Sequence, residues 1–308
     1  MSDSRPQGIV IIGTPRAGTT LLRRILDAHP RIACPPETYL LSAAARFLHE
    51  ERFAAGLRIG VLSGLAFAGF EEPEVLARLR GLVFGFLDDH ARARGKSRWA
   101  EKTAFDAFHL PAIERMLSGH VRFVCIQRHG LDVACSLAEL VDKTGGYVQE
   151  LHDYLRRDPE PLVALAHAWV DAAEHVAGLV ERDPLALDLR YEDLVRDPEA
   201  VVRRVLEHVG EPYDDTLLAR ALAEPGQLGF GDWKTYGRAA IDGSSVDRWR
   251  TLPSPTASRL AEVCNPMLVR LGYEPVEIDQ APSDEDARHR YAMGLRLQQM
   301  RAGKSHEQ

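Results

Sequence analysis

A glycine-bounded loop near the N-terminus has the composition and spacing of an anion-binding site. It runs from Gly13 to Thr20 and has the sequence Gly-Thr-Pro-Arg-Ala-Gly-Thr-Thr. Glycines let backbone N–H groups turn inward around an anion, and the N-terminus of a following helix adds a partial positive charge. The Gly-x4-Gly spacing between an apolar run and a helical pattern therefore predicts a phosphate-binding loop rather than an ordinary turn.

The residue after the second glycine distinguishes this loop from that of nucleotide triphosphatases. Those enzymes place a lysine there, which reaches the β- and γ-phosphates, whereas this chain has Thr19 and carries its positive charge on Arg16. Such a loop suits a terminal group with less charge than a phosphoryl group, for example a sulfuryl group. The apolar run at 122–126 ends in Gln127-Arg128 and offers no evident carboxylate for magnesium, so we expect no metal.

A second candidate anion contact follows that apolar run. Arg128 comes directly after an expected strand, and ligands gather at the carboxyl ends of strands in open α/β sheets. Ser136 lies eight residues later, about two turns into the next helix. Together they could hold one phosphate from two sides. The alternatives are a surface arginine and an ordinary helical serine.

The elements that position these residues alternate between short apolar runs and amphipathic segments. The alternation predicts an α/β fold, in which helices flank a parallel β-sheet that carries the phosphate loop. Residues 39–94 are predicted to be helical throughout and to form an acceptor-side insertion after the first strand–helix unit. Strands are expected at 9–12, 122–126 and 186–189, and further helices from Thr19 and at 131–141, 160–182, 199–209, 215–223 and 255–271.

Composition limits the classes of protein that this chain can represent. It has 308 residues, 45% of them hydrophobic, with a net charge of −7, so no overall attraction to nucleic acid or an anionic membrane is expected. We expect one domain over residues 1–278 and a charged tail over 279–308. No signal peptide or membrane span is expected, and four cysteines without a CxxC pair fit free thiols in the cytoplasm. The oligomeric state is left open, and a homodimer is one of the possibilities.

Four motifs occur in order between residues 9 and 272. They are residues 15–22, residues 124–130 followed by Ser136, residues 190–194, and residues 231–234 through 248–249. In this order they resemble sulfotransferases that use 3'-phosphoadenosine 5'-phosphosulfate (PAPS). Residues 26–30 and 36–38 are similar to the tyrosylprotein sulfotransferase branch and its bacterial relatives. The resemblance implies PAPS as cosubstrate, 3'-phosphoadenosine 5'-phosphate (PAP) as product, and no metal.

The resemblance also implies roles for individual residues. Glu37 matches a catalytic base and Lys102 a catalytic lysine at the leaving phosphate, so the two are expected on opposite sides of the sulfuryl group. Arg16 would hold the bridging and sulfuryl oxygens during in-line transfer, in which positioning and charge do most of the work. The expected nucleotide contacts are Arg16, Ala17, Gly18, Thr19 and Thr20 in the loop, Arg128 and Ser136 at the 3'-phosphate, Tyr191 near the nucleotide, and Lys234 and Arg248 in a closing loop over the adenosine end.

Two departures bear on the acceptor. The tyrosylprotein branch carries arginines where this chain has Tyr39 and Leu140, which favours a small-molecule or natural-product hydroxyl over peptide tyrosine. A lipid, a polyketide-like metabolite and a sugar all stay open. The alternatives to a sulfotransferase are a P-loop kinase for a small molecule and a PAP-binding protein without catalysis. If Glu37 were not the base, the candidates to replace it would be His29, His109 and His129.

Overall fold

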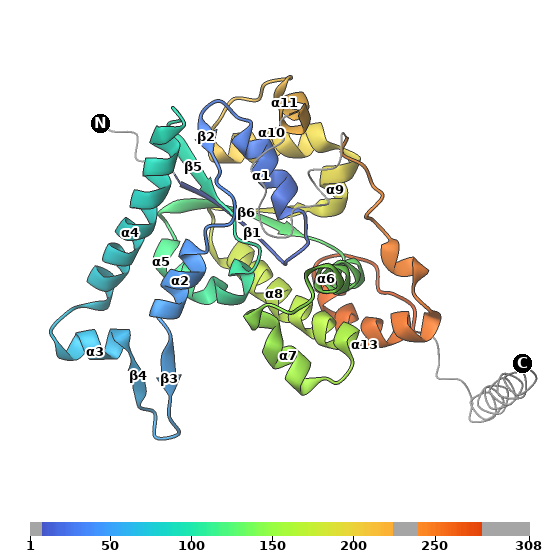
Figure 1. Cartoon of the computed structure of the whole chain (residues 1–308), viewed down its shortest axis with the longest axis horizontal. Coiled ribbons are helices and arrows are strands. Elements are labelled where there is room, and N and C mark those ends of the chain that lie inside the picture. The colour runs from blue at the N-terminus through green and yellow to red at the C-terminus, as the bar shows by residue number, and fades with distance from the viewer. Residues whose placement is uncertain (1–7, 224–239, 279–308) are drawn as a thin grey trace, which may run out of the picture.

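A five-stranded parallel sheet forms the centre of the molecule. The structure, a computed structural model, describes residues 8–223 and 240–278. The strands lie in the order β2-β5-β1-β6-β7, and every neighbouring pair is parallel (Figure 1). Their bounds are β1 Gly8–Gly13, β2 Ile32–Ala33, β5 Arg98–Glu101, β6 Val121–Gln127 and β7 Ala186–Arg190. The predicted α/β class is confirmed.

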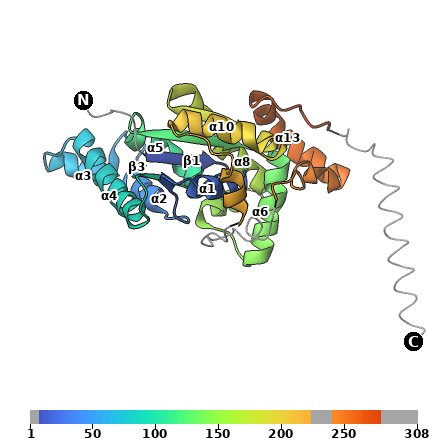
Figure 2. The same cartoon turned by 90° about the horizontal axis from the view of Figure 1, so that it is seen from above.

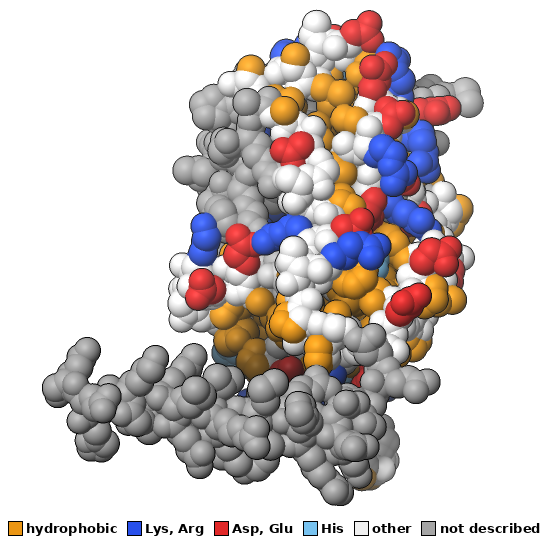
Figure 3. Space-filling model, turned by 90° about the vertical axis from the view of Figure 1, so that its right-hand side faces the viewer, with side chains coloured by type: hydrophobic (Ala, Val, Ile, Leu, Met, Phe, Trp, Pro, Cys, Tyr) orange, Lys and Arg blue, Asp and Glu red, His pale blue; other side chains and the backbone are white. Residues whose placement is uncertain are grey.

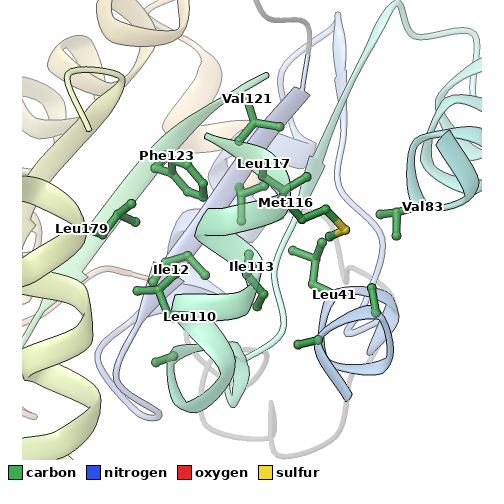
Figure 4. Close-up of a cluster of buried hydrophobic side chains, with 14 of the residues drawn as sticks. Ile12, Leu41, Val83, Leu110, Ile113, Met116, Leu117, Val121, Phe123 and Leu179 are labelled. Carbon is green, nitrogen blue, oxygen red and sulfur yellow. The ribbon is translucent and has the colours of Figure 1, made fainter. Parts of the chain in front are cut away.

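The central strands are buried on both faces, which explains their continuous apolar runs. On β1, Val10 and Ile12 contribute to one core cluster, whereas Ile9 and Ile11 contribute to another. The alternation follows from the two-residue period of a strand. Figure 4 shows the first cluster, in which Ile12 and Phe123 lie beside Leu110 and Ile113 of α5 (Leu110–Leu117). The sheet edge at the carboxyl ends is thereby held between two packed layers.

Helices cover both faces of the sheet. Those that contribute to the first cluster are α2 Leu40–Phe47, α3 Val61–Phe67, α4 Glu72–Ala93, α5 Leu110–Leu117 and α8 Pro161–Arg182. Those that contribute to the second are α1 Thr19–Asp27, α9 Tyr191–Arg196, α10 Pro198–Val209 and α11 Leu217–Ala223. Helices α6 Gly130–Thr144, α8 and α13 Ser254–Arg270 pack together in a third cluster. The other helical segments are α7 His152–Arg157 and the short 3-10 turns Asp106–His109, Gln149–Leu151 and Arg248–Thr251.

The ends of the molecule are formed by different parts of the chain. Figures 1 and 2 show α3 and α4 at one end and α13 at the other. On the face nearest α13, basic and acidic side chains are interspersed, with no large field of one sign among the described residues (Figure 3). Within the same described part of the chain, no helix is long and apolar enough to cross a membrane. The predicted tail, residues 279–308, lies outside the described residues.

Several elements differ from the sequence predictions, among them residues 39–94 and β5. Residues 39–94 are not helical throughout, because β3 (Glu50–Arg52) and β4 (Arg58–Gly60) form an antiparallel hairpin between α2 and α3. Strand β5 was not predicted, because Arg98 and Glu101 interrupt its apolar run although all four of its residues are buried. Arg98 is accommodated there by the Val209 carbonyl and the Glu211 carboxylate, to which Nη1 donates at 2.5 and 3.0 Å.

Candidate functional site

One pocket opens at the carboxyl ends of the strands. Strand β1 leads into the loop that begins at Thr14, β6 leads to Arg128, and β7 leads to Tyr191. The empty volume, including the open mouth, is about 970 Å³, within the range of small-ligand sites. The predicted site residues that line it are Arg16, Gly18, Thr19, Thr20, Glu37, Arg128, Ser136 and Tyr191. Most of the predicted site residues therefore lie around one cavity, and their roles stay predictions.

The predicted phosphate loop has the backbone conformation of an anion cradle. Arg16 has a φ of 71° and Gly18 a φ of 97°, and both lie in the left-handed region. Alternation between right- and left-handed residues turns successive N–H groups to one side. Gly18 also has no room for a side chain, since a Cβ atom there would lie 2.5 Å from the Tyr191 ring. Helix α1 begins at the next residue, Thr19, so its N-terminus faces the pocket.

Two arginines lie close together at this loop: Arg16 belongs to it, and Arg128 reaches it from the end of β6. The Nε of Arg16 donates to Oγ of Ser136 on α6 at 3.2 Å. Nη1 of Arg128 donates to the Arg16 carbonyl at 2.9 Å, and its guanidinium lies 4.6 Å from the centre of the Tyr191 ring. Among the described residues, the Nε of Arg128 has no hydrogen-bond partner although it is buried. Buried polar atoms are rarely left unpaired, and Arg128 lines the pocket, so this atom fits a pocket that takes a polar ligand.

A buried ion pair connects the phosphate loop to the chain that follows α1. Nζ of Lys102, the residue after β5, donates to Oε1 of Glu37 at 2.8 Å and to Oγ1 of Thr20 at 3.1 Å. The same Glu37 oxygen accepts from the Ala104 N–H at 3.2 Å. The lysine side chain is fully buried, and 4% of the glutamate side chain is exposed. Lys102 does not itself line the pocket but contacts two residues that do.

This arrangement corrects one sequence prediction. Glu37 and Lys102 were expected on opposite sides of the reacting group, whereas the structure pairs them directly. The physical reason is the sheet order, because β5 lies beside β1 and brings Lys102 under the loop. A lysine ammonium has three donors, so it can contact Glu37 and Thr20 together.

A buried network holds the turn that presents Glu37. Oε1 of Glu101 accepts from the hydroxyls of Thr38 and Thr103 at 2.6 and 3.0 Å. The N–H of Tyr39 donates to Thr103 Oγ1 at 3.2 Å, and Ser42 on α2 donates to Asp106. Glu101 and Asp106 are both fully buried. The two residues after Glu37, Thr38 and Tyr39, are thus bonded to the end of β5 and to the segment that follows it.

Neutralising Asp106 is expected to remove one contribution that lowers the free energy of unfolding as the pH rises. Burial and the nearby Glu101 carboxylate raise the pKa of Asp106 well above its usual value. The folded chain therefore holds this proton at pH values where the unfolded chain has released it, so folding stability falls as the pH rises above about 3.9. In Asp106→Asn this loss disappears. The slope of the unfolding free energy against pH between pH 4 and 8, measured by urea titration, should be less negative than in wild type.

The control for this change is the exposed Asp89→Asn, which removes a surface ion pair with Arg92. Its pH slope should match that of wild type. A slope for Asp106→Asn equal to that of wild type would show that the Asp106 carboxyl carries no linked proton.

The segment that begins at residue 240 is anchored on α6. Oδ1 and Oδ2 of Asp132 accept from the N–H groups of Trp249 and Asp247, each at 2.9 Å. Arg248, predicted as a nucleotide contact, does not line the pocket and instead donates to Glu139 at 3.0 Å. Its predicted role stays untested. Lys234 lies outside the described residues.

Other predicted residues lie outside the pocket. Ala17 of the loop is fully buried and does not line it. Each of the fallback histidines is engaged elsewhere: His29 with the Pro212 carbonyl, His109 with Glu150, and His129 stacked on Trp249. Burial also lowers the pKa of His129 to about 4. No histidine in the described ranges lines the pocket.

Some lining residues were missed in the sequence. Arg24 lies one turn after Thr20 on α1 and lines the pocket, a position that the i, i+4 spacing could have indicated. Ala104 and Phe105 line it near Glu37, and nothing in their residue types points to such a role. They are placed there by the turn after β5.

Comparison with protein families matches residues 6–215 to the Sulfotransferase family. Nodulation protein NoeE of Sinorhizobium fredii is 28% identical, over 86% of this chain and 65% of that protein. Protein-tyrosine sulfotransferase A of Caenorhabditis elegans is 25% identical, over 87% of this chain and 67% of that protein. The chain thus spans about two thirds of the length of these relatives.

Solved structures agree on the fold. The sulfotransferase domain from the curacin biosynthetic pathway aligns with a TM-score of 0.60 at 22% identity. The alignment covers 88% of this chain and all of that domain. At this identity the likeness concerns the fold.

Proposed function

The chain belongs to the sulfotransferase family, and on that basis we propose that it transfers a sulfuryl group from PAPS to a hydroxyl acceptor. The observation that carries the proposal is the contact of Lys102 with both Thr20 of the phosphate loop and Glu37. A cradle for an anion, a buried cation and a carboxylate meet there within hydrogen-bond distance. Transfer of a charged group to a hydroxyl requires these three parts.

The donor nucleotide would be held by residues on three strand ends. The loop from Arg16 to Thr20 faces the 5'-phosphosulfate, and Arg128 with Ser136 faces the 3'-phosphate. Tyr191 would support the same end through its ring, which already packs on Gly18 and under the Arg128 guanidinium. The Nε of Arg128, which has no partner among the described residues, supports a ligand rich in acceptor oxygens. Lys234 and Arg248 stay further candidates at the adenosine end.

The chemical step divides between Glu37 and the cations. When bound, PAPS supplies the sulfuryl group. Glu37 takes the proton from the acceptor hydroxyl as the acceptor oxygen bonds to sulfur. Lys102 and Arg16 stabilise negative charge as the bond from sulfur to the bridging oxygen breaks and PAP leaves. The contacts of Glu37 with Lys102 and with the Ala104 N–H orient the carboxylate before the acceptor arrives.

Arg128→Ala is expected to weaken PAP binding roughly tenfold or more. A hydrogen bond to a charged group contributes about 1.5–3 kcal/mol, and alanine removes every donor of the guanidinium. Adenosine 5'-phosphosulfate lacks the 3'-phosphate and should lose much less affinity. Calorimetric titration of both ligands measures the difference. Arg128→Lys, which keeps the charge, is the matched control and should keep part of the PAP affinity.

Equal losses for both ligands would place Arg128 away from the 3'-phosphate. Such a result would point to its contacts with Arg16 and Tyr191 as the cause, because damage to those contacts affects any nucleotide.

The proposed donor is tested by thermal stabilisation with competing nucleotides. PAP should raise the melting temperature in excess EDTA as much as in magnesium, because no metal is expected to take part. ATP with magnesium should stabilise less, because the loop has Thr19 where a triphosphate site has lysine. Stabilisation by magnesium-ATP but not by PAP would favour the kinase alternative. Loss of the PAP effect in EDTA would contradict donor binding without metal.

A further inference from the structure

A second cavity adjoins the pocket on the side of Glu37. Its empty volume, including the opening, is about 560 Å³. Helix α6 forms one wall with Leu137, Leu140 and Val141, and the chain after that helix forms another with Val148 and Leu151. Phe105 and Leu140 line both cavities, so the two meet at these side chains.

The junction lies next to the proposed base. Phe105 directly follows Ala104, whose N–H donates to Glu37 Oε1. Leu140 lies one turn after Ser136, which accepts from Arg16. Both junction side chains are buried, at 4% and 7% exposure. The two cavities are therefore neighbours on either side of Phe105 and Leu140, and a molecule with its hydroxyl at Glu37 reaches the second cavity when these side chains turn aside.

The walls of the second cavity are apolar. None of the residues that line it, all within the described chain, carries a charge. The hydroxyl of Thr144 donates to the Leu140 carbonyl at 2.9 Å and so already has a partner. Burying a polar group without a hydrogen bond is costly, whereas burying apolar surface is favourable. Besides Thr144, the one side chain of the lining with a hydroxyl is Tyr147, so the cavity offers few partners to a sugar with several hydroxyls.

From this geometry, and resting on the proposed function, we propose that the second cavity binds the apolar body of the acceptor. The acceptor is then an alcohol with its hydroxyl on an apolar carbon skeleton, rather than a sugar or a peptide tyrosine. Leu140 is an apolar side chain at the junction and offers no partner to a charged group. The acceptor is therefore expected to be uncharged near its reacting hydroxyl. Residues 39–94, predicted on the acceptor side, line neither cavity, and their role stays a prediction.

The proposal is tested with a series of straight-chain primary alcohols from 1-butanol to 1-decanol. Each methylene buried contributes about 0.8 kcal/mol, which corresponds to roughly a fourfold gain in kcat/KM. With labelled PAPS as donor, kcat/KM should rise by that factor per carbon until the cavity is filled. N-acetyltyrosine amide and glucose should be poorer acceptors than 1-octanol. A kcat/KM independent of chain length, or a preference for glucose, would overturn the proposal.

Two substitutions at half-buried Val148 test the location of the site. Val148→Phe fills space and should move the best acceptor to a shorter alcohol. Val148→Asp places a charge in the cavity and should lower kcat/KM for 1-octanol at least roughly tenfold, with PAP affinity within about twofold. Val269→Asp makes the same change on the exposed side of α13 and should leave both unchanged. Unchanged chain-length preference in both Val148 variants would overturn the proposal.

Failure of the proposed function gives a different result. In that case PAPS label reaches none of the alcohols, tyrosine or glucose, although the protein is folded. If label reaches glucose or the tyrosine derivative but not the alcohols, sulfuryl transfer stands and the apolar acceptor is wrong. Folding of each variant is checked by thermal stabilisation with PAP, and Val148→Phe keeps the test decisive if Val148→Asp does not fold.

Discussion

Replacing Glu37 by glutamine is expected to slow sulfuryl transfer at least about a hundredfold. A positioned base contributes roughly 10²–10⁴-fold, and glutamine keeps the shape of the side chain but cannot take a proton. The amide oxygen can still accept from the Ala104 N–H and from Lys102, so the turn should keep its position. PAP affinity should therefore stay within about threefold, less than 1 kcal/mol. Single-turnover transfer and calorimetric PAP titration, run on the same preparation, measure both quantities.

The control removes a charge from an ion pair far from the pocket. Glu114→Gln breaks the pair with Arg182, 2.7 Å long and partly exposed, and should leave turnover unchanged. Glu37→Gln should also lower the melting temperature, because it leaves the buried Lys102 without its anionic partner. Near-normal turnover in Glu37→Gln would exclude Glu37 as the base. The described histidines offer no replacement in the pocket, so the base would then lie elsewhere in the chain.

Lys102→Met should reduce turnover by roughly 10²–10³-fold. Removal of a preorganised group that stabilises developing charge has an effect of about this size. Methionine fills most of the buried volume but cannot donate to Thr20 or Glu37, so both the phosphate loop and the base lose a contact. The variant should be less stable than wild type for the same reason. Single-turnover rates below the melting temperature separate the loss of catalysis from unfolding.

Lys96→Met is the matched control, since Lys96 donates to the carbonyls of Asp27 and of Ile32 in β2 and lies outside the pocket. Its turnover should stay near that of wild type. The double variant Glu37→Gln/Lys102→Met should lose much less than the product of the two single losses, because the residues form one hydrogen-bonded unit. Strictly multiplicative losses would indicate that the two side chains act independently, contrary to their contact in the structure.

The local parts of the fold and site could be predicted because each depends on a short, continuous stretch of sequence. The phosphate loop needs only a strand, two glycines and a helix start in sequence, and all three lie within residues 8–27. Arg128 and Tyr191 were placed because each directly follows a strand, β6 or β7. Because β1, β6 and β7 are parallel neighbours in the sheet, their carboxyl ends lie at one edge.

The pairing of Glu37 with Lys102 could not be predicted, because it depends on register between distant segments. The residues are 65 positions apart, and β5 has no continuous apolar run. Its buried Arg98 is compatible with a strand only through Val209 and Glu211, more than a hundred residues later. The hairpin of β3 and β4 was missed for a related reason: its strands have three residues each and are mostly exposed, so they carry no apolar alternation.

Sulfuryl transfer itself is tested most directly by following labelled donors with the purified protein and a metabolite extract. One sample receives sulfur-labelled PAPS with EDTA, and the other receives γ-phosphorus-labelled ATP with magnesium. The proposed function predicts that sulfur label moves into a new product in the first sample and that no phosphorus label moves in the second, with Glu37→Gln abolishing most of the transfer. Movement of phosphorus label alone, or tight PAP binding with no sulfur label in any product, would contradict it.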